Sequence, residues 1–304
     1  MTEFLQNNIG YLINGVSVGG QYALIAIGYT MVYGILRLIN FAHGDVFMVA
    51  GLMIVYMSTI MPIWITLIFV LIITAMLGFF IERIAYRPLR SAPRMSVMIS
   101  AIGVSYLLQN CALYFSGGLP QVFPTIQSLS KTVDIWGTQV MVAKLVTPIL
   151  TLILIFVLLF LIKKTKIGMA MRAVSKDFET SQLMGIKIDL VISATFVLGC
   201  FLAAVGAILY FTCYPSVAPT SGSMPGLKAF VAAVFGGIGS IPGAVIGAFI
   251  IGIFENIIKG GSSIFGVQST GWTTFSDAFS FALLIIILMV KPTGIFGEKA
   301  TDKV

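Results

Sequence analysis

The sequence predicts an all-α integral membrane protein, a polytopic bundle of about eight or nine transmembrane segments with one of them broken at glycines. Hydrophobic residues make up 58% of the 304 residues and charged residues only 10%, whereas soluble domains run near 45–50% apolar and 25% charged. The apolar residues form long continuous runs rather than the short alternating runs of a membrane β-barrel, so helices are expected. This composition excludes a soluble enzyme, a DNA-binding domain and a disordered protein.

Eight apolar blocks divide the chain, which we treat as a single membrane domain over residues 1–304. Each is long enough, or nearly so, to cross a bilayer, which takes roughly 20 residues. They cover residues 9–36, 41–61, 63–81, 96–115, 145–162, 191–211, 227–258 and 275–290.

The seventh block is too long for one span and is interrupted by a glycine-rich stretch. Two short helices joined there would enter the membrane and return, which keeps the C-terminus on the side that its lysines favour. A single long, tilted helix is the alternative. The glycines given this structural role are Gly236, Gly237, Gly239 and Gly243.

Basic residues gather in three regions, and Lys and Arg favour the cytoplasmic side of membrane helices. The first lies between the third and fourth blocks, the second spans residues 163–190, and the third holds Lys291, Lys299 and Lys303. This distribution predicts an N-terminus outside and a cytoplasmic C-terminus. It also accounts for the net charge of +7 without a nucleic-acid partner.

The sequence lacks the common motifs of nucleotide-binding and catalytic sites. It contains no GxxxxGK[ST] phosphate-binding loop, no HExxH and no GxSxG. His43 is the single histidine, and the three cysteines (Cys111, Cys200 and Cys213) form no CxxC pair. We therefore expect neither an enzyme nor a metal site.

Four polar residues in or beside the spans are candidates for lining a transport path. Polar groups inside a membrane are costly and usually face the bundle interior or an aqueous path. Hydrogen bonds between helices are the alternative use for each of them. The four are Asn14, Gln21, Asn40 and Gln109.

Residues 40–45 bring a histidine and an aspartate to the point where the chain re-enters the membrane. We expect structural roles for His43 and Asp45. Asn40 or Asp45 is predicted to cap the next helix, and Gly44 to permit a tight turn. A proton relay through His43 is the functional alternative. Farther along, Glu255 is positioned to pair with Lys259 four residues later.

The longest predicted cytoplasmic segment covers residues 163–190. Residues 169–184 contain no Gly or Pro and favour one helix, which Gly185 would end. Met171, Val174 and Phe178 share a face of that helix. A short amphipathic helix of this kind lies on a membrane or docks into a groove of a soluble partner.

The segment also resembles the E-A-A-x-x-x-G signature of ABC-importer permeases, with Glu179, Thr180, Ser181 and Gly185 in register and both alanines replaced. The later I-x-L-P part of that signature is not evident. Five other stretches resemble LivH-type permeases of high-affinity branched-chain amino-acid importers, and the resemblance extends over nearly the whole chain. They are GQYALIAIGYTMVYGILRLINFAHGD at 20–45, ERIAYRPLRS at 82–91, SAIGVSYLLQN at 100–110, AVFGGIGSIPGAVIGA at 233–248 and KPTGIFG at 291–297.

The resemblance implies a subunit of the bacterial inner membrane that works with others. A LivM-type permease would pair with it, two cytoplasmic ATPase subunits would supply ATP and Mg, and an extracytoplasmic binding protein would deliver leucine, isoleucine or valine. Residues 170–185 would then be the helix that couples the chain to an ATPase. The coupling candidates are Met171, Arg172, Val174, Asp177, Phe178, Glu179 and Gly185.

Three other functions stay open. Related permeases carry urea or short-chain amides, and residues 40–44 favour the amino-acid branch. An ion-coupled secondary transporter is disfavoured because few acidic residues lie mid-span. A membrane-embedded enzyme is disfavoured by the missing catalytic motifs.

Overall fold

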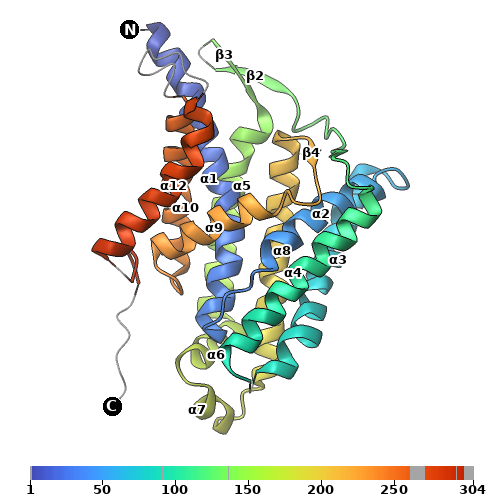
Figure 1. Ribbon diagram of the computed structural model, residues 1–304, viewed down its shortest axis with the longest axis vertical. Helices are drawn as coiled ribbons and strands as arrows, with labels where there is room; N and C mark the ends of the chain where they lie inside the picture. Colours follow the sequence, from blue (N-terminus) through green and yellow to red (C-terminus); the bar gives the residue numbers. More distant parts are fainter. Residues whose placement is uncertain (1, 91, 136, 261–270, 292, 298–304) are drawn as a thin grey trace.

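The computed structural model describes residues 2–90, 92–135, 137–260, 271–291 and 293–297, and in these ranges the chain is a helical bundle (Figure 1). Lys299 and Lys303, which belong to the third basic region of the sequence, lie outside the described residues. The α-helices are α1 (Thr2–Leu36), α2 (His43–Met57), α3 (Ile63–Ile81), α4 (Arg94–Ser116), α5 (Val142–Lys164), α6 (Lys166–Lys176), α7 (Phe178–Leu183), α8 (Ile188–Cys213), α9 (Ser223–Gly236), α10 (Ile241–Lys259) and α12 (Gly271–Val290).

Short irregular elements complete the fold. A π-helical turn η1 (Glu82–Tyr86) and a 3-10 turn η2 (Arg87–Leu89) extend α3. Strand β1 (Gln121–Val122) pairs antiparallel with β4 (Ser216–Val217), so that Gln121 faces Val217. Strands β2 (Thr132–Ile135) and β3 (Thr138–Met141) form a hairpin next to the start of α5.

The predicted class and number of segments are confirmed. Among the described residues, six helical stretches are long and apolar enough to cross a membrane, and three shorter apolar helices bring the total to nine. The six are Ile9–Leu36, Ile63–Leu89, Met95–Ser116, Val142–Lys164, Ile188–Cys213 and Ile241–Lys259; the shorter three are His43–Met57, Ser223–Gly236 and Ser276–Val290.

The break in the seventh block is also confirmed, because α9 ends at Gly236 and α10 begins at Ile241. Gly237 and Gly239 have φ angles of 106° and 99°, which favour glycine. The Ser240 side chain accepts a hydrogen bond from the Gly243 backbone N–H at 3.3 Å and so caps α10. Gly236 and Gly243 pack backbone to backbone where the two helices diverge.

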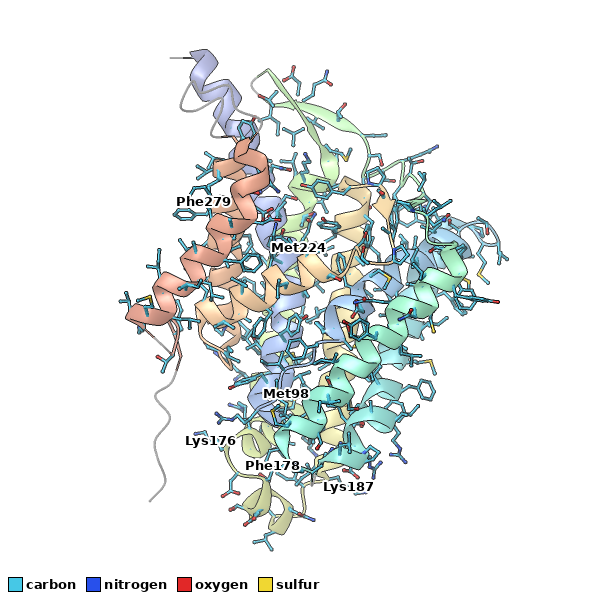
Figure 2. All side chains as sticks on the ribbon, viewed as in Figure 1. Met98, Lys176, Phe178, Lys187, Met224 and Phe279 are labelled. Atoms are coloured by element: carbon cyan, nitrogen blue, oxygen red, sulfur yellow. The ribbon has the colours of Figure 1, made fainter. Side chains whose placement is uncertain are left out.

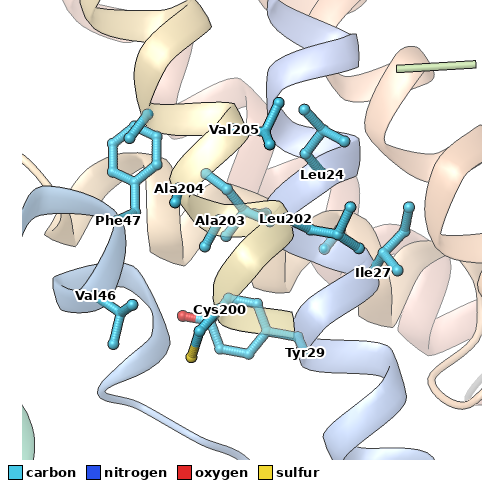
Figure 3. Packing of buried hydrophobic residues seen from close by; sticks show 14 of the residues in the cluster. Leu24, Ile27, Tyr29, Val46, Phe47, Cys200, Leu202, Ala203, Ala204 and Val205 are labelled. Atoms are coloured by element: carbon cyan, nitrogen blue, oxygen red, sulfur yellow. The ribbon is translucent and has the colours of Figure 1, made fainter. Parts of the chain in front are cut away.

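Helix α1 lies at the centre of the bundle and contacts α5, α8, α9 and α10. Within its apolar window 94% of the residues are buried, against 28%, 17% and 22% for α3, α4 and α5, so those three helices form the outside. Figure 3 shows part of the core between α1, α2 and α8, made of Leu24, Ile27, Val46, Phe47, Leu202, Ala203 and Ala204.

Glycines allow α1 and α10 to lie close together. A Cβ atom added at Gly19 would be 2.8 Å from the Cα of Phe249, and one at Gly15 would be 2.9 Å from the Cα of Ile253. The glycines spaced four residues apart therefore serve tight helix packing.

The prediction of one helix over 169–184 is wrong, because the chain forms α6 and α7 with a break at Asp177. Its backbone is extended (φ −155°, ψ 116°), and its carboxylate accepts hydrogen bonds from the N–H groups of Glu179 and Thr180. An N-cap at this point starts a new helix. The predicted end is confirmed: at Gly185 (φ 81°) the N–H groups of Gly185 and Ile186 donate to the carbonyls of Gln182 and Ser181.

The capping prediction for α2 is also wrong. The residue at its N-cap position is Ala42, and no side chain caps the helix. The Asn40 side chain instead accepts a hydrogen bond from Tyr86 Oη at 2.8 Å, and Asp45 bonds to α4. Gly44 lies within the first turn of α2 rather than in a tight turn.

Candidate functional site

Two of the shorter apolar helices, α2 and α9, meet at their N-termini. A Cβ atom added at Gly44 would be 2.7 Å from the carbonyl oxygen of Gly222, and one at Gly226 would be 2.8 Å from the Cα of Gly44. Met224, in the first turn of α9, lies about midway along the bundle (Figure 2). Short helices that start inside a membrane bundle are where transporters build their binding sites.

A pocket of about 390 Å³ opens beside this junction, between α2, α4 and α9. Small-molecule sites usually occupy about 300–1,000 Å³. Aromatic and aliphatic side chains form most of the wall, together with a small polar group. The lining residues are Tyr29, Ile39, Phe41, Gly44, Asp45, Ile102, Ser105, Tyr106, Gln109, Gly222, Ser223, Gly226, Leu227 and Phe230.

Asp45 is the charged residue of this pocket. Its carboxylate accepts hydrogen bonds from Ser105 Oγ and, at 2.9 Å, from Gln109 Nε2. Both donors come from α4, one helical turn apart, while Asp45 is in the first turn of α2. Polar side chains thus join two helices through a residue that is only 3% exposed.

The other three predicted path residues do not line this pocket. Asn14 Nδ2 donates to Asn256 Oδ1 at 2.6 Å, which joins α1 to α10. Gln21 Nε2 donates to the Leu209 carbonyl of α8 at 3.5 Å. Asn40 is buried against Tyr86 as described above. Of the four, Gln109 is the one that lines this pocket, and the path role stays a prediction for each of them.

His43 packs in the core next to the pocket. Its ring meets Tyr29 edge to face, with centroids 4.9 Å apart, and it lies against Gly28 of α1. The Nε2 atom has no hydrogen-bond partner among the described residues. The surroundings of His43 therefore favour packing over proton transfer.

A buried ion-pair cluster joins α1, α9, α10 and α12, and sequence reasoning missed its central lysine. Lys228 Nζ lies 2.7 Å from Glu255 Oε1 and 2.6 Å from Asp277 Oδ1. Glu255 also pairs with Lys259 at 2.5 Å, as predicted, and accepts a hydrogen bond from Tyr22 Oη at 3.0 Å. A lone lysine in the apolar block 227–258 is the signal that points to this cluster.

A second charged cluster ties the basic loop before α4 to the start of α8. Arg87 and Arg90 both pair with Asp189, and Arg90 also pairs with Glu82, whose side chain is fully buried. Next to this cluster lies a pocket of about 430 Å³ whose lining includes Phe178 and Gln182 of α7. The first basic region and the segment 163–190 thus lie at the same end of the bundle.

The predicted coupling residues are divided between this chain's interior and its surface. Met171 and Val174 are 6% and 0% exposed, contrary to the expectation that they form an apolar surface for a partner. They hold α6 against α1, α5 and α8. Asp177 is used to cap α7, and Gly185 ends α7.

The surface of this segment is formed by other residues. Arg172, Phe178 and Glu179 are exposed, and Figure 2 shows Phe178 between Lys176 and Lys187 at the end of the bundle. Leu183 and Met184 are 87% and 79% exposed. Sequence reasoning missed these two because the single helix that it assumed gave the wrong face.

Comparison with known proteins identifies the family. Residues 11–288 match the family model described as "Branched-chain amino acid transport system / permease component". The chain is 38% identical to the high-affinity branched-chain amino acid transport system permease protein BraD of Pseudomonas aeruginosa, covering 96% of this chain and 97% of that protein. It is 40% identical to the corresponding protein LivH of Escherichia coli K12, over the full length of both.

A more distant relative is the probable branched-chain amino acid transport permease protein LivH of Methanocaldococcus jannaschii, which is 28% identical over 98% of this chain and 96% of its own length. The match to the family model, residues 11–288, covers all the helices described above except the first residues of α1 and the last residues of α12. The chain is therefore a multi-pass membrane protein that belongs to the family of permease components of branched-chain amino acid transport systems.

Proposed function

We propose that this chain carries leucine, isoleucine and valine across the bacterial inner membrane as one permease subunit of an ATP-driven importer. The observation that carries the proposal is the full-length match to high-affinity branched-chain amino acid permeases. The sequence has no phosphate-binding loop of its own, so the energy of ATP must come from a partner.

Two cytoplasmic ATPase subunits, which hold ATP and Mg, are the partners that would supply this energy. The segment from α6 to α7 supports a docking site for one of them, because Phe178 and Leu183 of α7 and the following Met184 are exposed at this end of the bundle. Exposed apolar side chains at the end of a membrane protein, next to exposed charges, suit a groove on a soluble protein.

A second, LivM-type permease is the proposed neighbour within the membrane. Helix α4 is less apolar than α3 or α5, although its residues are at least as exposed. A lipid-facing helix gains from being apolar, so α4 suits a protein neighbour better than lipid. An extracytoplasmic binding protein completes the importer.

The orientation follows from the charges. The Arg87–Arg90 region and the segment 163–190 lie at one end of the bundle, and this end is cytoplasmic by the positive-inside rule. Helix α1 begins at the opposite end (Figure 1), so the N-terminus lies outside, and we retain the predicted cytoplasmic C-terminus.

Reconstitution tests the function. The chain is placed in liposomes with its companion permease, ATPases and binding protein, and leucine uptake is measured with ATP, with an ion gradient and with neither. We expect uptake only with ATP and the full set of subunits. Uptake by this chain alone on an ion gradient would show a secondary transporter, and ATP-driven uptake of urea but not leucine would show a related permease.

Variants of the α7 region test the coupling role. Glu179→Lys reverses an exposed charge, and Gly185→Pro removes a φ of 81° that proline cannot adopt. Both should abolish ATP-driven uptake while the chain still inserts. The matched control Lys131→Glu reverses an exposed charge at the other end and should leave uptake intact. Normal uptake in both test variants would rule out the coupling role.

A further inference from the structure

We infer that the pocket between α2, α4 and α9 is the substrate site of this chain and that Asp45 binds the ammonium group of the amino acid there. The inference rests on the proposed function and assigns it a place and a contact. It follows from the partners of the buried carboxylates, the chemistry of the pocket wall and the position of the pocket in the bundle.

Three carboxylates are buried among the described residues, and two of them have cationic partners. Glu82 pairs with Arg90, and Glu255 pairs with Lys228 and Lys259. Asp45 forms no ion pair with any described lysine, arginine or histidine. A buried charge without a counter-ion is costly in a membrane protein and usually marks a functional site.

The hydrogen bonds of Asp45 leave room for a cationic ligand. A carboxylate has about four acceptor positions, and Ser105 and Gln109 occupy one on each oxygen. The remaining positions suit an ammonium group, which has three donors and no acceptor. Since Asp45 lines the pocket, a ligand there can reach it.

The apolar residues of the pocket wall select the side chain of the amino acid. Ile39, Phe41, Ile102, Leu227 and Phe230 all line the pocket, and its wall contains no lysine or arginine from the described part of the chain. Apolar walls favour an aliphatic side chain. An acidic side chain would meet Asp45 without a compensating cation, so the pocket disfavours acidic amino acids. The expected ligand is an amino acid with an ammonium group and a neutral, branched aliphatic side chain.

The position in the bundle agrees with a transport role. The pocket lies where the short helices α2 and α9 begin, and both contribute their first turns to it through Gly44, Asp45, Ser223 and Gly226. A site at such a junction is reached from either side of the membrane when the helices around it rearrange.

The competing explanation is that Asp45 only fastens α2 to α4. Asp45→Asn separates the two, because asparagine keeps the shape and can still bond Ser105 and Gln109 but loses the charge. In the complete reconstituted importer, leucine uptake and ATP hydrolysis are measured together. Losing a charge-assisted hydrogen bond should lower leucine uptake per ATP hydrolysed by about 10- to 100-fold. Asp45→Glu keeps the charge and should restore part of that ratio.

Two tryptophan substitutions provide a second test that does not touch Asp45. Leu227 lines the pocket and is 44% exposed, so Leu227→Trp should fill the pocket and lower uptake per ATP. Leu152 is 45% exposed on the strongly apolar helix α5 and does not line the pocket, so Leu152→Trp is the matched control and should behave as wild type. These variants stay informative even if Asp45→Asn fails to reach the membrane.

The results that would overturn the substrate site differ from the result that would overturn the proposed function. Leucine uptake that stays at the wild-type level in Asp45→Asn, or equal losses in Leu227→Trp and Leu152→Trp, would overturn the site alone. Wild-type uptake per ATP in Asp45→Asn together with a loss in Asp45→Glu, with both variants assembled, would leave only the fastening role. A wild-type importer that takes up no leucine with ATP would instead overturn the proposed function.

Discussion

Glu255 is expected to be a main support of the bundle, and Glu255→Gln removes its charge with little change of shape. Glu255 contacts Lys228, Lys259 and Tyr22. In the variant, Lys228, which is 6% exposed, keeps only Asp277 as an anionic partner, and the Asp277 side chain is 36% exposed. The variant therefore takes an anionic partner from Lys228, and the ammonium group of this lysine cannot reach water unless α9 unpacks.

The size of the effect follows from these contacts. Removing one partner of a buried ion pair costs about 3–5 kcal/mol. Because Asp277 still compensates Lys228, we expect about 2–3 kcal/mol, or a midpoint of thermal unfolding about 5–10 °C lower. The control Lys259→Gln removes a partner that is 37% exposed, for which about 0–1 kcal/mol is expected.

Thiol labelling of detergent-solubilised protein can follow this unfolding. Cys200 is 1% exposed, so it reacts with a maleimide dye only when the bundle opens. The exposed Cys111 and the partly exposed Cys213 are first replaced by serine to remove background labelling. Equal unfolding midpoints for Glu255→Gln and Lys259→Gln would show that the buried ion pairs of Glu255 do not support the bundle. The double variant Lys228→Met/Glu255→Leu should be more stable than Glu255→Gln, because no buried charge is left with a weakened partner.

Two further predictions concern packing and charge, and the same assay measures both. Gly19→Ala should lower the midpoint through about 1–3 kcal/mol of overpacking against the α10 backbone, whereas Gly103→Ala, with no atom within 4 Å of the added Cβ, should not; equal midpoints would contradict the close approach of α1 and α10. Arg90→Met should destabilise by about 3–5 kcal/mol because buried Glu82 loses its cation, and an unchanged midpoint would show that Glu82 is not charged in the fold.

The sequence predicts the architecture well because lipid leaves the backbone few choices. A continuous apolar run in lipid must be a helix. The glycine-rich stretch at 236–243 predicts a break in one, and the φ angles of 106° and 99° at Gly237 and Gly239 confirm it. Regions where local patterns compete were predicted less well. Asp177 was read as part of a helix, although its side chain can also start one.

The features of the site that the sequence did not predict depend on contacts between residues far apart in the chain. Asp45 was expected to cap α2, yet its partners come from α4, with Gln109 lying 64 residues away in the sequence. Lys228 was not singled out because its partners Glu255 and Asp277 lie on α10 and α12. Periodicity cannot show which polar residues on different helices face each other, and it is these pairings that form the pocket and the ion-pair clusters.

In the importer we propose, an ATPase subunit acts on this chain through the α6–α7 region. A photo-reactive amino acid in place of Leu183, which is 87% exposed, tests the contact directly in the assembled importer. The matched position is Tyr114, which is 83% exposed near the end of α4. Illumination should give an adduct with the ATPase from position 183 and none from position 114. An importer that still transports leucine with ATP but gives no adduct from position 183, or equal adducts from both positions, would contradict the claim.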